Sequence, residues 1–454
     1  MDRENELKIP KRILNTLLVS LGAGVVPRTG APYIAIGRGD EIAALLSDIQ
    51  YVKEGGAAVR FLIGRYGSGK SFLIQLIRGY ALERDFLSAD CDLSPERRLS
   101  GGSGAGLATY KELLRNLASK ASPDGNALVT VLSRQYTAIA SALSKDGILP
   151  GMPEFKKRLC GAVYDALSSL EGEVCGFDFA RVLYEYYDAL SEDDTAKKSA
   201  CLRWLRGEFS TKTEARRALG FPVSCIVDDD NWYDFLRLWS ALSSLLGYSG
   251  LIVFIDECVN LYKIPNRISR EANYEKLLAI FNDTLQGRAR HLGVVFGGTP
   301  QFLEDTRRGL FSYEALRSRL SDSRFTELGF KTMTSPVIRL RRLSDNELLA
   351  LLIRLSRLFA MHTGKEELLS EKEIGEFLTA CLSRVGASEL VTPRELIRNF
   401  LALLNVLNEN ENAAFEDLLS RFSGIRSEED TSLPEEETSV DGKRENNFFA
   451  EFDF

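Results

Sequence analysis

A lysine and a serine at positions 70 and 71 end a glycine-rich segment with the spacing of a phosphate-binding loop, G-x-x-x-x-G-K-S. Glycines in such a loop let backbone N–H groups point at phosphate oxygens, and the helix expected after it adds its positive N-terminus. Lys70 would neutralise the β and γ oxygens, and the Ser71 hydroxyl would hold Mg²⁺. The pattern therefore predicts that a nucleoside triphosphate contacts Gly64, Arg65, Tyr66, Gly67, Ser68, Gly69, Lys70, Ser71 and Phe72.

A second chemical signal is a pair of carboxylates that follows a fully apolar run. The run Leu251 to Ile255 has the composition of a buried parallel strand, and Asp256 and Glu257 stand at its carboxyl end. Beside a phosphate loop, this pattern is typical of a Walker B motif. We expect Asp256 to support Mg²⁺ through its hydration shell and Glu257 to orient and polarise the attacking water.

Three further positions are candidates for contact with the nucleotide. Thr299 ends another apolar segment, so at the carboxyl edge of a parallel sheet it would sense the γ-phosphate or the catalytic water. The alternative is that Gly-Gly-Thr-Pro merely starts the next turn. Gly37 and Arg38 form a turn before an acidic, amphipathic segment, and we expect this turn to lie beside the adenine; a turn without ligand contact is the alternative.

Arginines occur at two places where a nucleotide would need them. Arg317 or Arg319, in an arginine-rich helical pattern, would reach the nucleotide of a neighbouring subunit as a finger, although a solvated helix face also explains them. Arg394 follows Thr392-Pro393, a helix start, and a cation is electrostatically unfavourable in that first turn. This conflict favours a role for Arg394 toward the nucleotide.

Composition places the chain among ordinary globular proteins and limits its partners. The 454 residues carry a net charge of −7, so no overall attraction to DNA or anionic lipid is expected. Seven scattered cysteines and only two histidines argue against a disulfide framework or a zinc site. No signal-peptide pattern or membrane-spanning apolar run is present, which predicts a cytoplasmic protein.

The order of apolar, glycine-rich and helical segments predicts an α/β fold of the P-loop NTPase type. Its parallel sheet would be flanked by helices and joined by a helical insertion and a C-terminal helical lid. The predicted parts are an N-terminal helix and linker, the first core segment, the inserted helical block, the second core segment, the lid, and an acidic tail with an aromatic end: 1–30, 31–106, 107–222, 223–342, 343–425 and 426–454.

These elements, in this order, resemble an AAA+ ATPase. The segment from Val59 to Ser71, with Asp92-Leu93-Ser94-Pro95-Glu96-Arg97-Arg98-Leu99, further resembles the ATP-binding proteins of bacterial BREX-type phage-defence loci, over about residues 8–422 and the aromatic end. The resemblance implies an ATPase of anti-phage defence whose genetic neighbours include helicases and DNA-modifying enzymes. It also makes Thr299 a first sensor, where many AAA+ proteins have asparagine, and Arg394 a second sensor.

Three functions fit these patterns. The favoured one is an oligomeric ATPase that uses ATP and Mg²⁺ to remodel DNA or to load a helicase or nuclease partner, with local arginine clusters as possible DNA contacts. The second is a nucleotide-gated switch or scaffold with slow turnover that does not depend on DNA. The third, a small-molecule kinase, is disfavoured because Glu257 suits activation of water rather than of another acceptor.

The last eight residues contain four phenylalanines, at positions 448, 449, 452 and 454. A water-exposed chain rarely leaves such a segment without a surface to dock on. Two alternatives follow: the segment folds back on its own chain, or it binds a neighbouring subunit or partner.

Overall fold

The computed structural model describes residues 9–102, 104–149, 152–322, 333–383, 392–410 and 412–424. The predicted acidic tail and its aromatic end, 426–454, lie outside these residues. Within the described ranges, no helix is long and apolar enough to cross a membrane.

The centre of the protein is a parallel sheet whose five strands lie in the order β2-β3-β4-β1-β5. Every residue of β3 and β4 is buried, which explains why both segments are continuous apolar runs. Because the strands are parallel, their carboxyl ends meet at one edge of the sheet. The strands are β1 (Ala57–Ile63), β2 (Leu87–Asp92), β3 (Leu251–Asp256), β4 (Leu292–Gly298) and β5 (Val337–Arg339).

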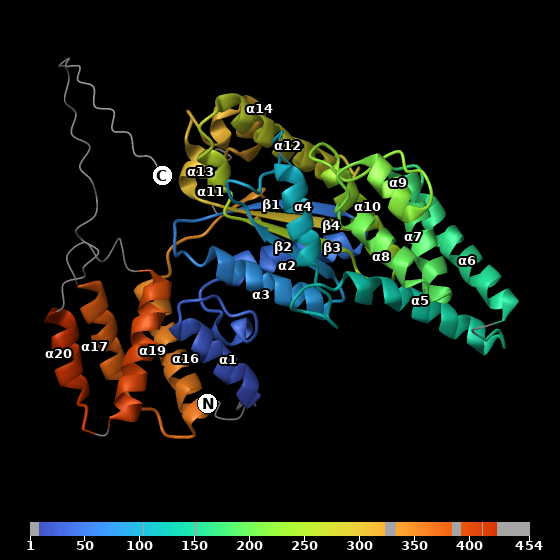
Figure 1. The fold of residues 1–454 in the computed structure, drawn as a ribbon. Helices are drawn as coiled ribbons and strands as arrows, with labels where there is room; N and C mark the ends of the chain where they lie inside the picture. Colours follow the sequence, from blue (N-terminus) through green and yellow to red (C-terminus); the bar gives the residue numbers. More distant parts are fainter. Residues whose placement is uncertain are drawn as a thin grey trace, which may run out of the picture.

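Helices cover both faces of this sheet (Figure 1). One face packs against α2 (Gly39–Lys53) and α3 (Lys70–Glu83), with Leu73 and Phe254 in the shared core. The other face packs against α4 (Ala105–Arg115), α10 (Trp232–Leu245) and α12 (Arg267–Leu285). Short elements at the carboxyl edge complete this layer: α11 (Val259–Tyr262), α13 (Pro300–Glu304), η3 (Leu310–Ser312) and α14 (Glu314–Leu320). The expected parallel sheet flanked by helices is confirmed.

A block of helices between β2 and β3 extends from one side of the sheet (Figure 1). Its core is continuous with the core under α10, because the Phe179 ring meets Trp239 edge-on at 5.2 Å between centroids and Trp204 meets Phe235 at 5.4 Å. The block contains α5 (Leu128–Lys145), α6 (Pro153–Leu167), η2 (Ser168–Leu170), α7 (Gly176–Ser191), α8 (Thr195–Leu205) and α9 (Lys212–Leu219).

A separate helical bundle has its own apolar core, and it contains helices from both ends of the described chain. Leu17 of α1 (Lys11–Gly22) shares this core with Leu355 and Phe400 from the C-terminal helices. The short η1 (Ala31–Ile34) leads from α1 toward α2. The C-terminal helices are α16 (Asp345–Thr363), α17 (Glu371–Leu382), α19 (Pro393–Glu409) and α20 (Phe415–Gly424).

Candidate nucleotide-binding site

The phosphate loop joins the end of β1 to the start of α3, and its glycines are required for different reasons. Gly67 and Gly69 have φ values of 71° and 91°, in the left-handed region where a side chain is strained. Gly64 lies in a tight space, since a Cβ atom there would lie 2.3 Å from the Ser68 Oγ and 3.2 Å from the Leu340 Cβ. The loop therefore curls tightly enough for its N–H groups to surround an anion.

Lys70 and Ser71 lie at the start of α3, and Ser71 connects the loop to the end of β3. The Lys70 ammonium donates to the carbonyl oxygens of Gly64, at 3.0 Å, and Arg65, at 3.2 Å. Desolvation lowers the Lys70 pKa, and the negative charges of Asp256 and Glu257 oppose that shift. The Ser71 hydroxyl donates to the Asp256 carboxylate at 2.8 Å, although 185 positions separate the two residues.

A glycine on the neighbouring strand makes room for Asp256. A Cβ atom at Gly297 would lie 2.1 Å from the Asp256 Oδ1, so only glycine permits this carboxylate to occupy its position beside β4. The same Oδ1 accepts the Glu257 N–H at 2.8 Å. Glu257 itself has a φ of 55°, unusual for a residue with a side chain, which turns the chain sharply after β3.

Two other polar residues flank this carboxylate pair at the carboxyl edge of the sheet. Thr299 is buried directly after β4, and its Oγ1 accepts the Phe302 N–H at 3.3 Å as the N-cap of α13. Asp92 ends β2 in register with Asp256. Desolvation, followed by the charges of Asp256 and Glu257, raises the Asp92 pKa. Negative charge is therefore concentrated beside the phosphate loop, where a divalent cation would neutralise it.

A cavity of about 280 Å³ lies between the phosphate loop and the helical bundle. Its polar end contains Lys70, Ser71 and Glu257. Its remaining wall is mainly apolar and comes from three separate stretches of chain. These apolar residues, which the sequence patterns did not reveal, are Leu21, Val25, Val26, Pro27, Ile34, Ile36, Leu343, Leu351, Pro393 and Ile397. An aromatic base and a charged phosphate chain would match the two ends of the cavity.

Arg38 holds the phosphate loop through a hydrogen bond to its backbone. Its side chain is buried, it donates to the Ser68 carbonyl at 2.8 Å, and it pairs with the buried Glu41 at 3.4 Å. Desolvation lowers the Arg38 pKa despite the Glu41 charge. Arg38 also lines the cavity, whereas Gly37 contacts the bundle: a Cβ atom there would lie 2.6 Å from the Glu347 Oε1.

The start of α19 contacts the phosphate loop directly. Thr392 is the N-cap of α19, as its sequence predicts, and Glu395 completes the capping box. A Cβ atom at Gly67 would lie 2.5 Å from the Thr392 Cγ2. Arg394, in the first turn, lines the cavity and approaches Gly24. The C-terminal bundle therefore closes one side of the cavity.

Residues 9–422 match the family described as BREX system ATP-binding protein BrxC/D. The chain belongs to this family. No curated protein matches it. Membership in BrxC/D identifies the chain as an ATP-binding protein of the BREX phage-defence system.

The structure brings most, but not all, of the predicted residues of this BrxC/D protein to the cavity. The predicted residues that line it are Arg38, Tyr66, Gly67, Ser68, Gly69, Lys70, Ser71, Phe72, Glu257 and Arg394. Gly37, Gly64, Arg65, Asp256 and Thr299 are outside the lining but contact residues of the loop, the bundle or the sheet edge. Arg317 and Arg319 are exposed on α14 and do not line the cavity of their own chain.

Proposed function

We propose that this protein hydrolyses ATP to ADP and phosphate as an AAA+ ATPase of anti-phage defence. The observation that carries the proposal is that Lys70, Ser71 and Glu257 line the polar end of one cavity. Asp256 lies just outside the lining, where its carboxylate accepts hydrogen bonds from the Ser71 hydroxyl and the Glu257 N–H. A protein that only binds ATP needs the phosphate loop. Glu257 follows β3, which is separated from β1 and its phosphate loop by β4. Its carboxylate would supply, in addition, a base for the attacking water.

The donor set at this end suits Mg²⁺. A hydroxyl oxygen and a carboxylate oxygen that already lie 2.8 Å apart, at Ser71 and Asp256, are hard oxygen ligands of the kind Mg²⁺ prefers. Mg²⁺ bound there would neutralise charge on the β- and γ-phosphates. The Ser68 Oγ is buried without a hydrogen-bond partner among the residues described, and a phosphate oxygen would satisfy it.

Each polar residue then has a distinct role in hydrolysis. Lys70 would leave the Gly64 and Arg65 carbonyls to bind the γ-phosphate, and Glu257 would accept a proton from the attacking water. Within the described residues the Thr299 oxygen accepts from the Phe302 N–H and its hydroxyl donates to no protein acceptor, so that hydrogen is available for the nucleotide or the water. Arg394 would bind the phosphates and so couple nucleotide binding to the position of the C-terminal bundle, which would act as a lid.

The active assembly in this proposal is a homo-oligomer in which α14 faces the nucleotide of the next subunit. Of its two arginines, Arg319 donates to the Ala315 carbonyl at 2.7 Å, whereas no side-chain partner of Arg317 exists within the described part of the chain. Arg317 is therefore the better candidate for the finger.

The work coupled to hydrolysis would be remodelling of DNA or loading of a helicase or nuclease partner. Several arginines of the predicted basic clusters already pair with carboxylates, for example Arg60 with Asp48 and Arg339 with Glu304. By contrast, Arg216 and Arg217 are exposed on α9 and have no side-chain partner in the described ranges. We therefore expect any DNA contact to involve α9 rather than those paired clusters.

Steady-state phosphate release, with and without single- or double-stranded DNA, tests this function. Glu257→Gln should lower the rate by about 10²- to 10⁴-fold while ATP still binds. Arg317→Ala should lower it similarly, and Arg319→Ala should have the smaller effect. Slow turnover that changes neither with DNA nor with the Glu257→Gln and Arg317→Ala substitutions would instead establish a nucleotide-gated switch. Transfer of the phosphoryl group to an acceptor other than water would establish a kinase.

A further inference from the structure

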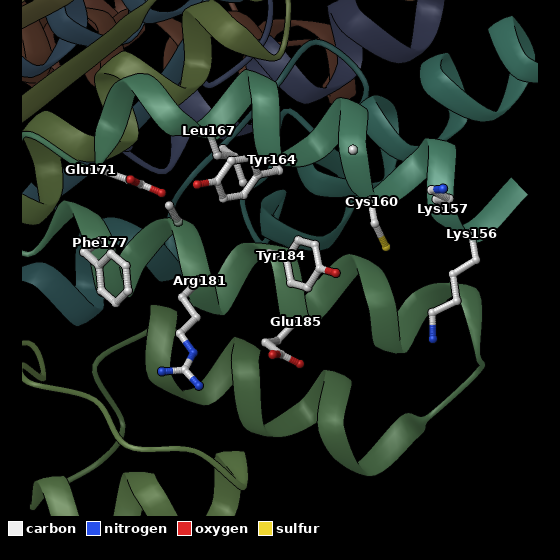
Figure 2. A pocket seen from close by; sticks show the side chains of 12 residues that line it. Lys156, Lys157, Cys160, Tyr164, Leu167, Glu171, Phe177, Arg181, Tyr184 and Glu185 are labelled. Carbon is white, nitrogen blue, oxygen red and sulfur yellow. The ribbon is translucent and has the colours of Figure 1, made fainter. Parts of the chain in front are cut away.

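A groove of about 790 Å³ lies between α6 and α7, away from the nucleotide site. It lies in the inserted helical block, and Figure 2 shows the side chains that line it. Tyr164 and Phe177 are 56% and 59% exposed, although both are large and apolar. Such aromatic exposure beside a concave surface is typical of a docking site.

Charge at the groove is uneven. Lys156 is held by Asp188 at 3.0 Å and by Glu192, and Glu185 is held by Lys197. Lys157 and Arg181 have no carboxylate partner in the part of the chain that the structure describes; Arg181 stacks 4.3 Å from the Phe221 ring centre. Glu171 is the acidic lining residue that has no ion-pair partner among the described residues. The groove therefore offers two cations to an acidic ligand.

The segment 447–454 matches this groove in composition. Its four phenylalanines would contact the aromatic lining, and its two acids, Glu451 and Asp453, would face Lys157 and Arg181. We propose that this aromatic segment docks in the α6–α7 groove of a neighbouring copy of the chain. The proposal extends the oligomer of the proposed function by naming a contact that builds it.

The placement of the helices favours a neighbouring copy over the same chain. The last described helix, α20, and the groove between α6 and α7 lie at opposite ends of the molecule (Figure 1). A chain of about 24 residues, the separation of Gly424 and Phe448, reaches at most about 80 Å, and only when it is fully extended. Docking across an interface would avoid that stretching.

Cys160 provides a reporter within the groove, because it is half-buried among the lining residues and lies beside Tyr184 (Figure 2). The test uses the full chain carrying Ala450→Cys, which retains all four phenylalanines of the segment. Isotope-labelled and unlabelled chains are mixed, treated with a mild thiol oxidant, digested and mapped by mass spectrometry. The expected product is a 160–450 disulfide that joins labelled to unlabelled peptides and is lost in the Cys160→Ser background.

Two substitutions in the groove give an independent reading. Tyr164→Ser with Phe177→Ser, both at exposed positions, should reduce the 160–450 product by about tenfold. Tyr51→Ser, a matched change at a tyrosine that is 57% exposed on α2, should leave the yield unchanged. Absence of the 160–450 link, a link confined to single chains, or a yield indifferent to the groove substitutions would each overturn the proposal.

The same samples separate this contact from the ATPase function. Phosphate release by the Ala450→Cys protein is measured before oxidation, in reducing buffer. A mixed-label link from a protein that lacks turnover would support the docking and reject the ATPase. Normal turnover without the link would reject the docking alone.

Discussion

Single atoms decide the geometry of the carboxylate pair at the carboxyl edge of the sheet. The Asp256 carboxylate occupies the space that a Cβ atom on Gly297 would need, and from that position it reaches both Ser71 and the Glu257 N–H. The Asp256 carboxylate can therefore occupy this position only because residue 297 has no side chain. The apolar run that predicts β4 does not indicate this requirement, because the contact joins residues of two neighbouring strands, β3 and β4.

Gly297→Ala should therefore lower ATP hydrolysis by about 100-fold, the effect of moving a catalytic group by roughly 1 Å. The added methyl group would displace the Asp256 Oδ1, which lies 2.1 Å from the position of that methyl. Gly293→Ala on the same strand is the matched control, because the one close approach of its Cβ among the described residues would be to the end of the Ile252 side chain, at 2.7 Å, and no carboxylate would be displaced. Steady-state phosphate release compares the two. Equal losses would mean that the strand, not the carboxylate, responds.

Arg38 allows a similar separation of roles, since it combines a buried ion pair with support for the phosphate loop. Arg38→Met leaves the Glu41 carboxylate buried and unpaired, and we expect a loss of about 3 kcal/mol in the free energy of unfolding. It should also weaken ATP binding, because the Ser68 carbonyl loses its donor.

The double variant Arg38→Met with Glu41→Met distinguishes these effects. Removing both charges should restore much of the stability, measured by urea unfolding, while ATP affinity, measured by calorimetry, stays low. Recovery of affinity together with stability would show that Arg38 affects the nucleotide only through the fold.

At the scale of elements, the strands that carry the site were predictable and the cavity wall was not. The apolar runs at β1, β3 and β4 are long because helices cover both faces of the sheet, so their patterns are strong. By contrast, β5 has only three residues and was not predicted. The apolar wall is assembled from α1 and its following loop, α16 and α19, and no local pattern marks residues that meet only after folding.

The junction between the core and the bundle contains a carboxylate, Glu347, whose protonation should affect stability. Hydrogen bonds from Arg341, and then from the Ser344 N–H, lower the Glu347 pKa to about 2. Since the unfolded value is about 4.3, this carboxylate stabilises the folded chain above that pH, and the contribution is lost as pH falls toward 2. Glu347→Gln should remove this part of the acid dependence while glutamine preserves the capping box.

Urea unfolding across this pH range measures the difference between the two proteins. The difference should be largest near neutral pH and should shrink below about 4.3. Glu376→Gln is the control, because its ion pair with Lys372 is exposed and should contribute little. A difference that stays constant with pH would mean that Glu347 acts through packing against Gly37 rather than through charge.

At the scale of the whole molecule, the cavity is lined by Lys70, Glu257 and Arg394 but by no arginine from α14. If Arg317 completes the site of a neighbour, the site is shared, and two defects on different chains must complement each other. Arg317→Ala retains its own Glu257, and Glu257→Gln retains Arg317. A subunit of the first kind beside one of the second kind would hold an intact site.

Equal amounts of the two inactive proteins, mixed under conditions of subunit exchange, should therefore recover turnover in about one site in four. The recovery should disappear when Arg317→Ala is mixed with a chain carrying both substitutions, because that chain supplies no finger. Phosphate release by the mixture, compared with the sum of the separate proteins, is the measurement. A mixture no more active than that sum would mean that Arg317 lies outside the catalytic site. The arginines of α14 would then be explained as a solvated helix face.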